Sequence, residues 1–297
     1  MAISRNQSKV SKKPPKEFQD YVNARRRPAV FLFLADSMGI SHVIQLRDAL
    51  GNRKFNELDL VVNSGGGSIH AAYQIVELLR LHTAKLNACV PFFAKSAATL
   101  LCIGSDAIIL DELAQLGPLD TQIYEEKKTG KSEFTSALNP FKTLEQLQKY
   151  SLETLDIGVK MFTMRSGMDL EDCIKHAIEL VRVTTGPLFN QLNPEKLGEY
   201  SRALSVGIEY GERLLRRFTT WDDQKRAEVL ERLVHGYPSH DYIIDYHELQ
   251  EIGFEVKLFT EDERPAVHGL YKHISHQTFV ECIEPTTDAQ KKTTTEK

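Results

Sequence analysis

Two short loops of small residues, each directly after an apolar strand, constrain this chain more than any other feature of its sequence. Residues 64–68 read SGGGS and follow DLVVN, and residues 94–98 read AKSAA and follow ACVPFF. Each loop leads into a segment that we expect to be helical, at 69–82 and at 97–104. Together with apolar runs at 29–34 and 107–110, this alternation predicts a parallel sheet with right-handed βαβ crossovers.

The second half of the chain has a different pattern, in which helical spacing dominates between residues 140 and 235. A short strand, a helix and another strand are then expected within residues 242–257. We therefore expect an α/β domain at 29–258 that carries a helical elaboration at about 140–235. Polar and Lys-rich composition predicts a disordered basic arm at 1–28, and we expect a C-terminal extension and disordered tail at 259–297.

Charge and cysteine content limit the classes of partner. Residues 1–28 carry eight Lys and Arg against two acids, although the whole chain has a formal net charge of -4. Such an arm could touch nucleic acid or an anionic surface, but a solvated leader is the favoured interpretation. No apolar run is long enough to suggest a signal peptide or a membrane helix. Four cysteines without paired spacing indicate neither a disulfide frame nor a metal site, and favour a cytoplasmic location.

Ser96, in the second loop, has the position of an activated nucleophile. At a strand-to-helix junction its hydroxyl would lie near the positive end of a helix dipole, and the N–H of Ala97 would face a developing oxyanion. The alternative is that Ser96 only caps the helix. In the first loop, three glycines allow a tight turn and expose backbone N–H groups that could hold an oxyanion. That loop lacks the spacing of a dinucleotide loop and the lysine of a P-loop.

In combination, the two loops resemble a known family. NSGGGSIHAAYQIVELL is similar to a segment of the Clp protease proteolytic subunit and of signal peptide peptidase A, and AKSAATLLCIGSDAIIL is similar to their serine segment. LGPLDTQI (116–123) and SHDYIIDYHELQEIGFEV (239–256) most resemble the serine dehydrogenase proteinase family. This resemblance implies a Clp/crotonase-like parallel βαβ spiral core with an added helical region. It also implies Ser96 as the nucleophile, and Gly66, Gly67 and Ala97 around the oxyanion hole. The departure is Gly65, where the Clp motif has proline.

The proton acceptor for Ser96 stays open between several residues. The stretch after the fourth strand has no histidine, so the usual Ser-His-Asp order is not preserved. Asp241 has the spacing of the Clp triad aspartate from its glycine, and the neighbouring His240 could supply an imidazole. Lys142 opens the long helix, as the lysine of a Ser-Lys dyad does in some relatives. Lys95 is expected to point away from Ser96 and to position substrate or the loop.

Asp120 could orient the base or bind the substrate backbone, or it could simply belong to a turn after Pro118. We therefore predict a serine peptidase that acts on a polypeptide through an acyl-enzyme and needs no metal or organic cofactor. By analogy with related folds we expect a homo-oligomer that has no membrane anchor. Two alternatives remain, namely an inactive scaffold of the same fold and a crotonase-type acyl-CoA enzyme.

Overall fold

The computed structural model describes residues 14–119, 122–126, 132–274 and 278–286. The chain divides into two compact units. The first contains Met1–Leu119 and Tyr210–Lys297, and the second contains Asp120–Glu209. The expected helical elaboration, about 140–235, therefore differs from the second unit, because the residues from Tyr210 onward belong to the first unit.

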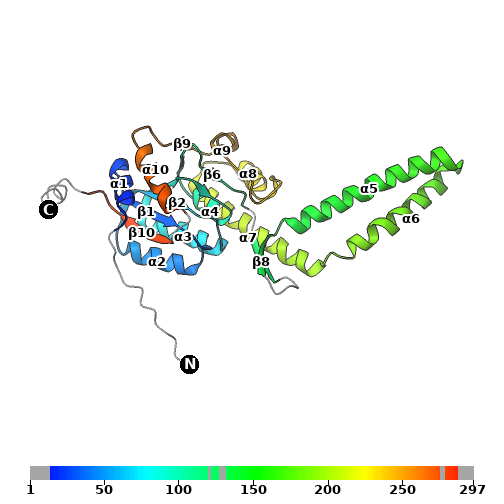
Figure 1. Cartoon of the computed structure of the whole chain (residues 1–297), viewed down its shortest axis with the longest axis horizontal. Coiled ribbons are helices and arrows are strands. Elements are labelled where there is room, and N and C mark those ends of the chain that lie inside the picture. The colour runs from blue at the N-terminus through cyan, green and yellow to red at the C-terminus, as the bar shows by residue number, and fades with distance from the viewer. Residues whose placement is uncertain (1–13, 120–121, 127–131, 275–277, 287–297) are drawn as a thin grey trace, which may run out of the picture. The chain divides into compact units, whose positions relative to one another are not determined.

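A mostly parallel sheet of six strands forms the centre of the first unit (Figure 1). Its order is β10 (Phe279–Ile283), β1 (Ala29–Phe33), β2 (Phe55–Asn63), β3 (Thr83–Val90), β5 (Ala107–Leu110) and β9 (Val256–Leu258). All neighbouring strands are parallel except β10 and β1. Every residue of β1 is buried, as expected for a strand that is covered on both faces. The predicted mixed α/β architecture is confirmed.

Helices cover both faces of this sheet. On one face, alternate residues of β1, Ala29, Phe31 and Phe33, pack with side chains of α1 (Lys16–Arg25) and α10 (Arg264–Leu270). The other face carries α2 (Ile40–Leu50) and α3 (Ile69–His82) (Figure 1). The remaining helical elements of this unit are α4 (Ala97–Ile103), the last part of α7 (Pro194–Phe218), α8 (Asp223–His235), α9 (Tyr246–Ile252) and the 3-10 turn Tyr271–His273.

Two terminal segments belong to the core, which corrects the expected boundaries. Residues 16–25 form α1 and are not part of a disordered arm, because Phe18, Tyr21 and Val22 make an apolar stripe at helical spacing and are all buried. The Phe18 ring stacks on Phe31 with a centroid separation of 4.5 Å. At the other end of the chain, β10 pairs with β1, which lies far from it in the sequence. Residues 279–283 are therefore also part of the sheet.

A second, smaller layer of strands positions the two loops. It consists of β4 (Phe93–Ala94) and β6 (Gln115–Leu116), which pair in parallel. Ser64 bridges to Ala94 on one side of this pair, and Ile244 bridges to Leu116 on the other. The layer therefore lies beside the C-terminal ends of β2 and β3, where the functional loops begin.

The second unit is built around an antiparallel helical hairpin, in which α5 (Asn139–Ser166) and α6 (Leu170–Phe189) lie side by side (Figure 1). It also contains the strand pair β7 (Gln122–Glu126) and β8 (Ser132–Ser136) and the first part of α7 (Pro194–Phe218). Among the described residues, no helix combines the length and the apolarity that crossing a membrane would require.

Candidate active site

Ser96 has a strained backbone at the junction of β4 and α4. Its φ is 53° and its ψ is -123°, and it is one of two non-glycine residues with positive φ in the described chain. Such a conformation costs about 1–3 kcal/mol and persists only where surrounding contacts impose it. Those contacts are backbone hydrogen bonds, which run from Lys95 N–H to Ser64 O at 3.0 Å and from Thr99 N–H to Ser96 O at 2.8 Å.

The strained turn lacks the geometry of a helix cap. Ser96 occupies the N-cap position of α4, but its side chain makes no capping hydrogen bond to that helix. A capping serine normally has extended backbone angles and accepts a hydrogen bond from the second or third helical N–H. Ser96 shows neither feature, so helix capping does not explain its presence. With 3% of its surface exposed, it lies at the bottom of the junction.

The glycine loop lies directly against Ser96. Gly66 has a φ of 106°, and a Cβ added there would lie 2.8 Å from both Lys95 O and Ser96 Cβ. Gly67, with a φ of 139°, leaves no room for a Cβ because it packs against the backbone of Met38. Around Gly65, by contrast, the space is open. The two loops that are 30 residues apart in the sequence thus form one site, and glycine is required at two of its three positions.

Backbone N–H groups near Ser96 divide into engaged and available donors. The N–H of Gly66 donates to Ser64 Oγ at 3.1 Å and is therefore not available to an oxyanion in this conformation. Gly66 instead allows the glycine loop to pack closely against Ser96. Within the part of the chain that the structure describes, the N–H groups of Gly67 and Ala97 donate to no protein acceptor. Ala97 is the first residue of α4, where an N–H has no partner inside the helix. These two groups can therefore serve an oxyanion.

Lys95 extends from the nucleophile turn across Gly117. A Cβ at Gly117 would lie 2.6 Å from Lys95 Cδ, so only glycine admits the side chain on this path. Its Nζ donates to the carbonyls of Tyr242 at 3.2 Å and Asp241 at 3.4 Å. Burial lowers the pKa of Lys95 from the ordinary value of a lysine, and the negative charge of Asp241 opposes this change.

The 239–244 loop reaches the same place because it pairs with β6. Leu116 and Ile244 exchange two backbone hydrogen bonds, of 2.9 and 3.1 Å. Tyr242 stacks on Tyr237 with ring centroids 4.7 Å apart, which fixes the loop further. Asp241 is thereby brought to Lys95, and the half-buried His240 lies next to it in the same turn. Residues that are more than 140 positions apart in the chain meet at this edge.

Thr99 is a site residue that was not expected from the sequence. Its hydroxyl lies 2.7 Å from the carbonyl of Gly117 and 3.1 Å from that of Ala94, and the residue is fully buried. It therefore ties α4 to β4 and to the loop over which Lys95 runs. The feature of the sequence that could have indicated this role is a hydroxyl residue in the otherwise apolar segment AATLLCI, three residues after Ser96.

Lys142 belongs to the second unit and lacks the surroundings of a catalytic lysine. Its side chain is 46% exposed and pairs with Glu145 at 3.4 Å. A lysine that accepts protons needs burial to lose its charge near neutral pH, and Lys142 is not buried. It lines a shallow groove on α5 that extends to Tyr150. Asp120, the remaining residue of the expected site, lies outside the described residues.

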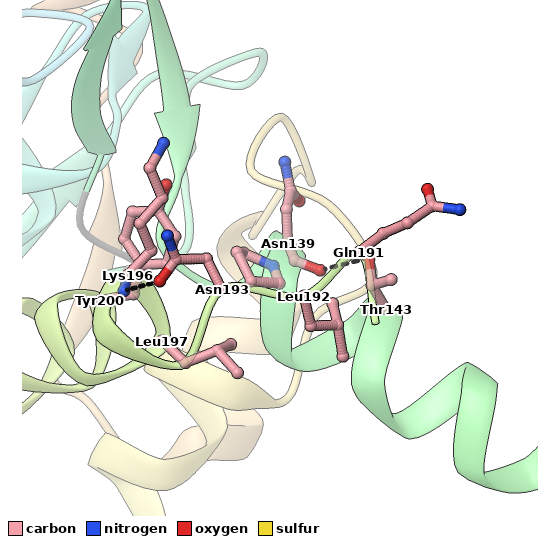
Figure 2. A pocket seen from close by; sticks show the side chains of 9 residues that line it. Asn139, Thr143, Gln191, Leu192, Asn193, Lys196, Leu197 and Tyr200 are labelled. Atoms are coloured by element: carbon pink, nitrogen blue, oxygen red, sulfur yellow. Dashed lines mark hydrogen bonds between the residues drawn. The ribbon is translucent and has the colours of Figure 1, made fainter. Parts of the chain in front are cut away.

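A separate pocket of about 290 Å³ lies within the second unit (Figure 2). The start of α5 contributes Asn139 and Thr143, and the start of α7 contributes Lys196 and Tyr200. Asn193, between α6 and α7, accepts hydrogen bonds from the backbone at the start of α7. None of the site residues expected from the sequence lines this pocket. In the described residues, no three His, Cys, Asp or Glu side chains are grouped as metal ligands.

Comparison with known proteins bears on this geometry. Residues 30–144 match the family described as ClpP-like SDH-type serine proteinase, which supports the suspected family over this part of the chain, and the mostly parallel sheet has the Clp/crotonase-like fold that this family implies. Two uncharacterized proteins of Methanocaldococcus jannaschii are also similar. One is 28% identical over 244 residues, which are 82% of this chain and 66% of the relative. The other is 26% identical over 226 residues, or 76% and 59%. This chain thus spans slightly less than two thirds of their lengths.

Proposed function

We propose that this chain is a serine peptidase that cleaves a polypeptide through an acyl-enzyme on Ser96, because residues 30–144 match the ClpP-like SDH-type serine proteinases. The observation that carries the proposal is the strained turn at Ser96, with Gly66 packed against it and two backbone donors beside it. An imposed backbone strain of this kind is typical of sites where a nucleophile must be exposed to a substrate carbonyl.

The reaction proceeds in two halves on these groups. Ser96 Oγ attacks the substrate carbonyl carbon, and its proton passes to a base while the N–H groups of Gly67 and Ala97 stabilise the oxyanion. Collapse of the tetrahedral intermediate breaks the C–N bond, and the base gives its proton to the departing amine. Water then attacks the acyl-enzyme by the same route and releases the acid. No step requires a metal ion or an organic cofactor.

His240 is the proton acceptor that the surroundings support best. Its loop is held at the edge of β6, and its neighbour Asp241 contacts the lysine next to the nucleophile. Lys95 has a lowered pKa, but its two carbonyl acceptors favour the protonated amine, so it acts as a clamp on the loop. Lys142 has the weaker support because it is exposed and paired with Glu145.

Hydrolysis of fluorescently labelled casein, an unfolded polypeptide, tests the function. We expect wild type to release small peptides and Ser96→Ala to release none. His240→Ala should lose at least about 100-fold in rate, as is typical when a general base is removed. Lys142→Ala is the matched control and should cleave like wild type. Loss of cleavage in Lys142→Ala, with normal cleavage by His240→Ala, would instead identify Lys142 as the base.

Two alternative functions are tested by measurements made beside the casein assay. A folded wild type that neither cleaves casein nor reacts with a serine-directed probe would indicate a scaffold of this fold. Turnover of an acyl-CoA thioester that Ser96→Ala retains would indicate a crotonase-type enzyme. We also propose a cytoplasmic location, which the free thiols of Cys89, Cys102, Cys173 and Cys282 support.

A further inference from the structure

The loop between β1 and α2 holds the glycine loop through backbone hydrogen bonds on both sides of Gly67. Met38 N–H donates to Gly66 O at 2.8 Å, and Ser68 N–H donates to Met38 O at 2.8 Å. Gly66 O and the Gly67 N–H belong to one trans peptide, in which they point in opposite directions. The bond from Met38 therefore turns the Gly67 N–H, one of the two donors assigned to the oxyanion, away from the β1–α2 loop.

A buried histidine fixes this loop in turn. His42 is the third residue of α2 and is 3% exposed. Its Nδ1 accepts a hydrogen bond from Gly39 N–H at 3.0 Å, and its own N–H donates to Gly39 O at 3.0 Å. Because Nδ1 accepts, the neutral imidazole carries its proton on Nε2. Nε2 lies 3.5 Å from Asp36 Oδ1, which also accepts a hydrogen bond from the hydroxyl of Thr278, just before β10.

The imidazole contacts both ends of the segment 36–39, and Met38 lies between them. Capping of α2 would need only the bond to Gly39, which as glycine has no side chain to provide a cap. The second contact, with Asp36, closes the segment around Met38. A shift of Met38 would be passed directly to Gly67, since a Cβ added to Gly67 would lie 2.5 Å from Met38 O.

We propose that His42, oriented by Asp36, is a positioning residue for the oxyanion hole. It holds the backbone of Met38, which sets the peptide between Gly66 and Gly67 and so aims the Gly67 N–H. This role rests on the proposed peptidase function of Ser96. His42 acts only through the backbone. An oxyanion donor contributes most in the transition state, where the charge develops, so its misplacement lowers kcat and leaves KM nearly unchanged.

Two amide substitutions of His42 separate the bond to Gly39 from the rest of the side chain. In His42→Asn, Oδ1 is as many bonds from Cα as Nδ1 is, so it can still accept the Gly39 N–H. In His42→Gln, the amide lies one bond farther out and this acceptor is lost. With casein, we expect His42→Gln to lower kcat by about 10- to 100-fold with KM changed by less than about threefold, and His42→Asn to keep kcat within about threefold of wild type.

Asp222→Ala is the matched control for the loss of a helix cap. The Asp222 side chain caps α8 by accepting the Lys225 N–H at 2.7 Å, and its loss should leave kcat unchanged. Asp36→Ala changes a side chain that is 62% exposed, so it keeps the core intact even if His42→Gln does not fold. We expect it to lower kcat at least about threefold, because the imidazole loses the group that orients it.

Hydrogen exchange of backbone amides provides a readout that does not use activity. The N–H groups of Met38 and Ser68 should exchange faster in His42→Gln than in wild type and His42→Asn, while amides of β2 and β3 keep their protection. A merely structural role of His42 would lower the stability without changing kcat in the folded protein and without this local change in exchange.

Several results would overturn the positioning role and leave the function of Ser96 standing. They are a wild-type kcat in His42→Gln or Asp36→Ala, an equal loss in both His42 variants, an equal loss in Asp222→Ala, and unchanged exchange at Met38 and Ser68. A folded wild type that neither cleaves casein nor reacts with a serine-directed probe would instead remove the proposed function, and the positioning role with it.

Discussion

Replacing Gly66 by alanine should damage the site far more than the same change at Gly65. An alanine at position 66 must adopt a φ of 106°, at a cost of about 1–2 kcal/mol. Its Cβ would also lie 2.8 Å from Lys95 O and Ser96 Cβ, and relief of such overpacking costs about 1–3 kcal/mol. Together these changes predict a loss of about 2–5 kcal/mol from the free energy of unfolding.

Part of that strain should appear as a displacement of Ser96. A shift of about 1 Å between reacting groups slows a reaction roughly 100-fold, so we expect Gly66→Ala to cleave casein at about that reduced rate. At Gly65 the space is open, and Gly65→Ala should change the stability by no more than about 0.5 kcal/mol. Urea unfolding and the casein assay measure both quantities. A Gly66→Ala variant as stable and as active as Gly65→Ala would refute the close approach of the two loops.

Three further substitutions probe the site and the ion pairs of Arg25 in the first unit. Thr99→Val leaves two buried carbonyls without their hydroxyl partner, which should cost about 1–3 kcal/mol in urea unfolding, whereas Thr99→Ser should cost less. Arg25→Met removes the ion-pair partner that lies 2.8 Å from the fully buried Asp59, and it should lower the free energy of unfolding by about 3–5 kcal/mol. A decrease below about 1 kcal/mol would contradict a buried pair. Burial would raise the pKa of Glu263, but the Thr260 N–H and the charge of Arg25 outweigh it and lower that pKa. The carboxylate therefore stabilises the fold above about pH 5 and loses this effect as the pH falls through its folded pKa. The free energy of unfolding of wild type should exceed that of Glu263→Gln by less at pH 3 than at pH 7. A difference that does not depend on pH would be inconsistent with this pair.

The local architecture followed from the sequence because its signals are local. Buried parallel strands read as continuous apolar runs, and β1 and β5 lie where such runs occur. Strand β3 was expected at 88–93 but spans Thr83–Val90. Polar residues of its first half concealed its start, and Pro91, which has no N–H to donate, ends it before the apolar run does.

Contacts between distant segments were not predictable in the same way. Nothing in the sequence near Gly117 indicates that Lys95 crosses it, or that Leu116 pairs with Ile244. The two loops around Ser96 and Gly66 were expected to meet because both follow neighbouring strands of one sheet. Helix α1 was missed because its three apolar residues lie among charged ones, so only their helical spacing distinguishes it from a solvated arm.

Intact-mass analysis after treatment with a fluorophosphonate tests the central claim most directly, since the probe bonds only to an activated serine. We expect one adduct per wild-type chain, none on Ser96→Ala, and an unchanged adduct on the control Lys142→Ala. An adduct that persists in Ser96→Ala, or a folded wild type that never reacts, would contradict the assignment of Ser96 as the nucleophile.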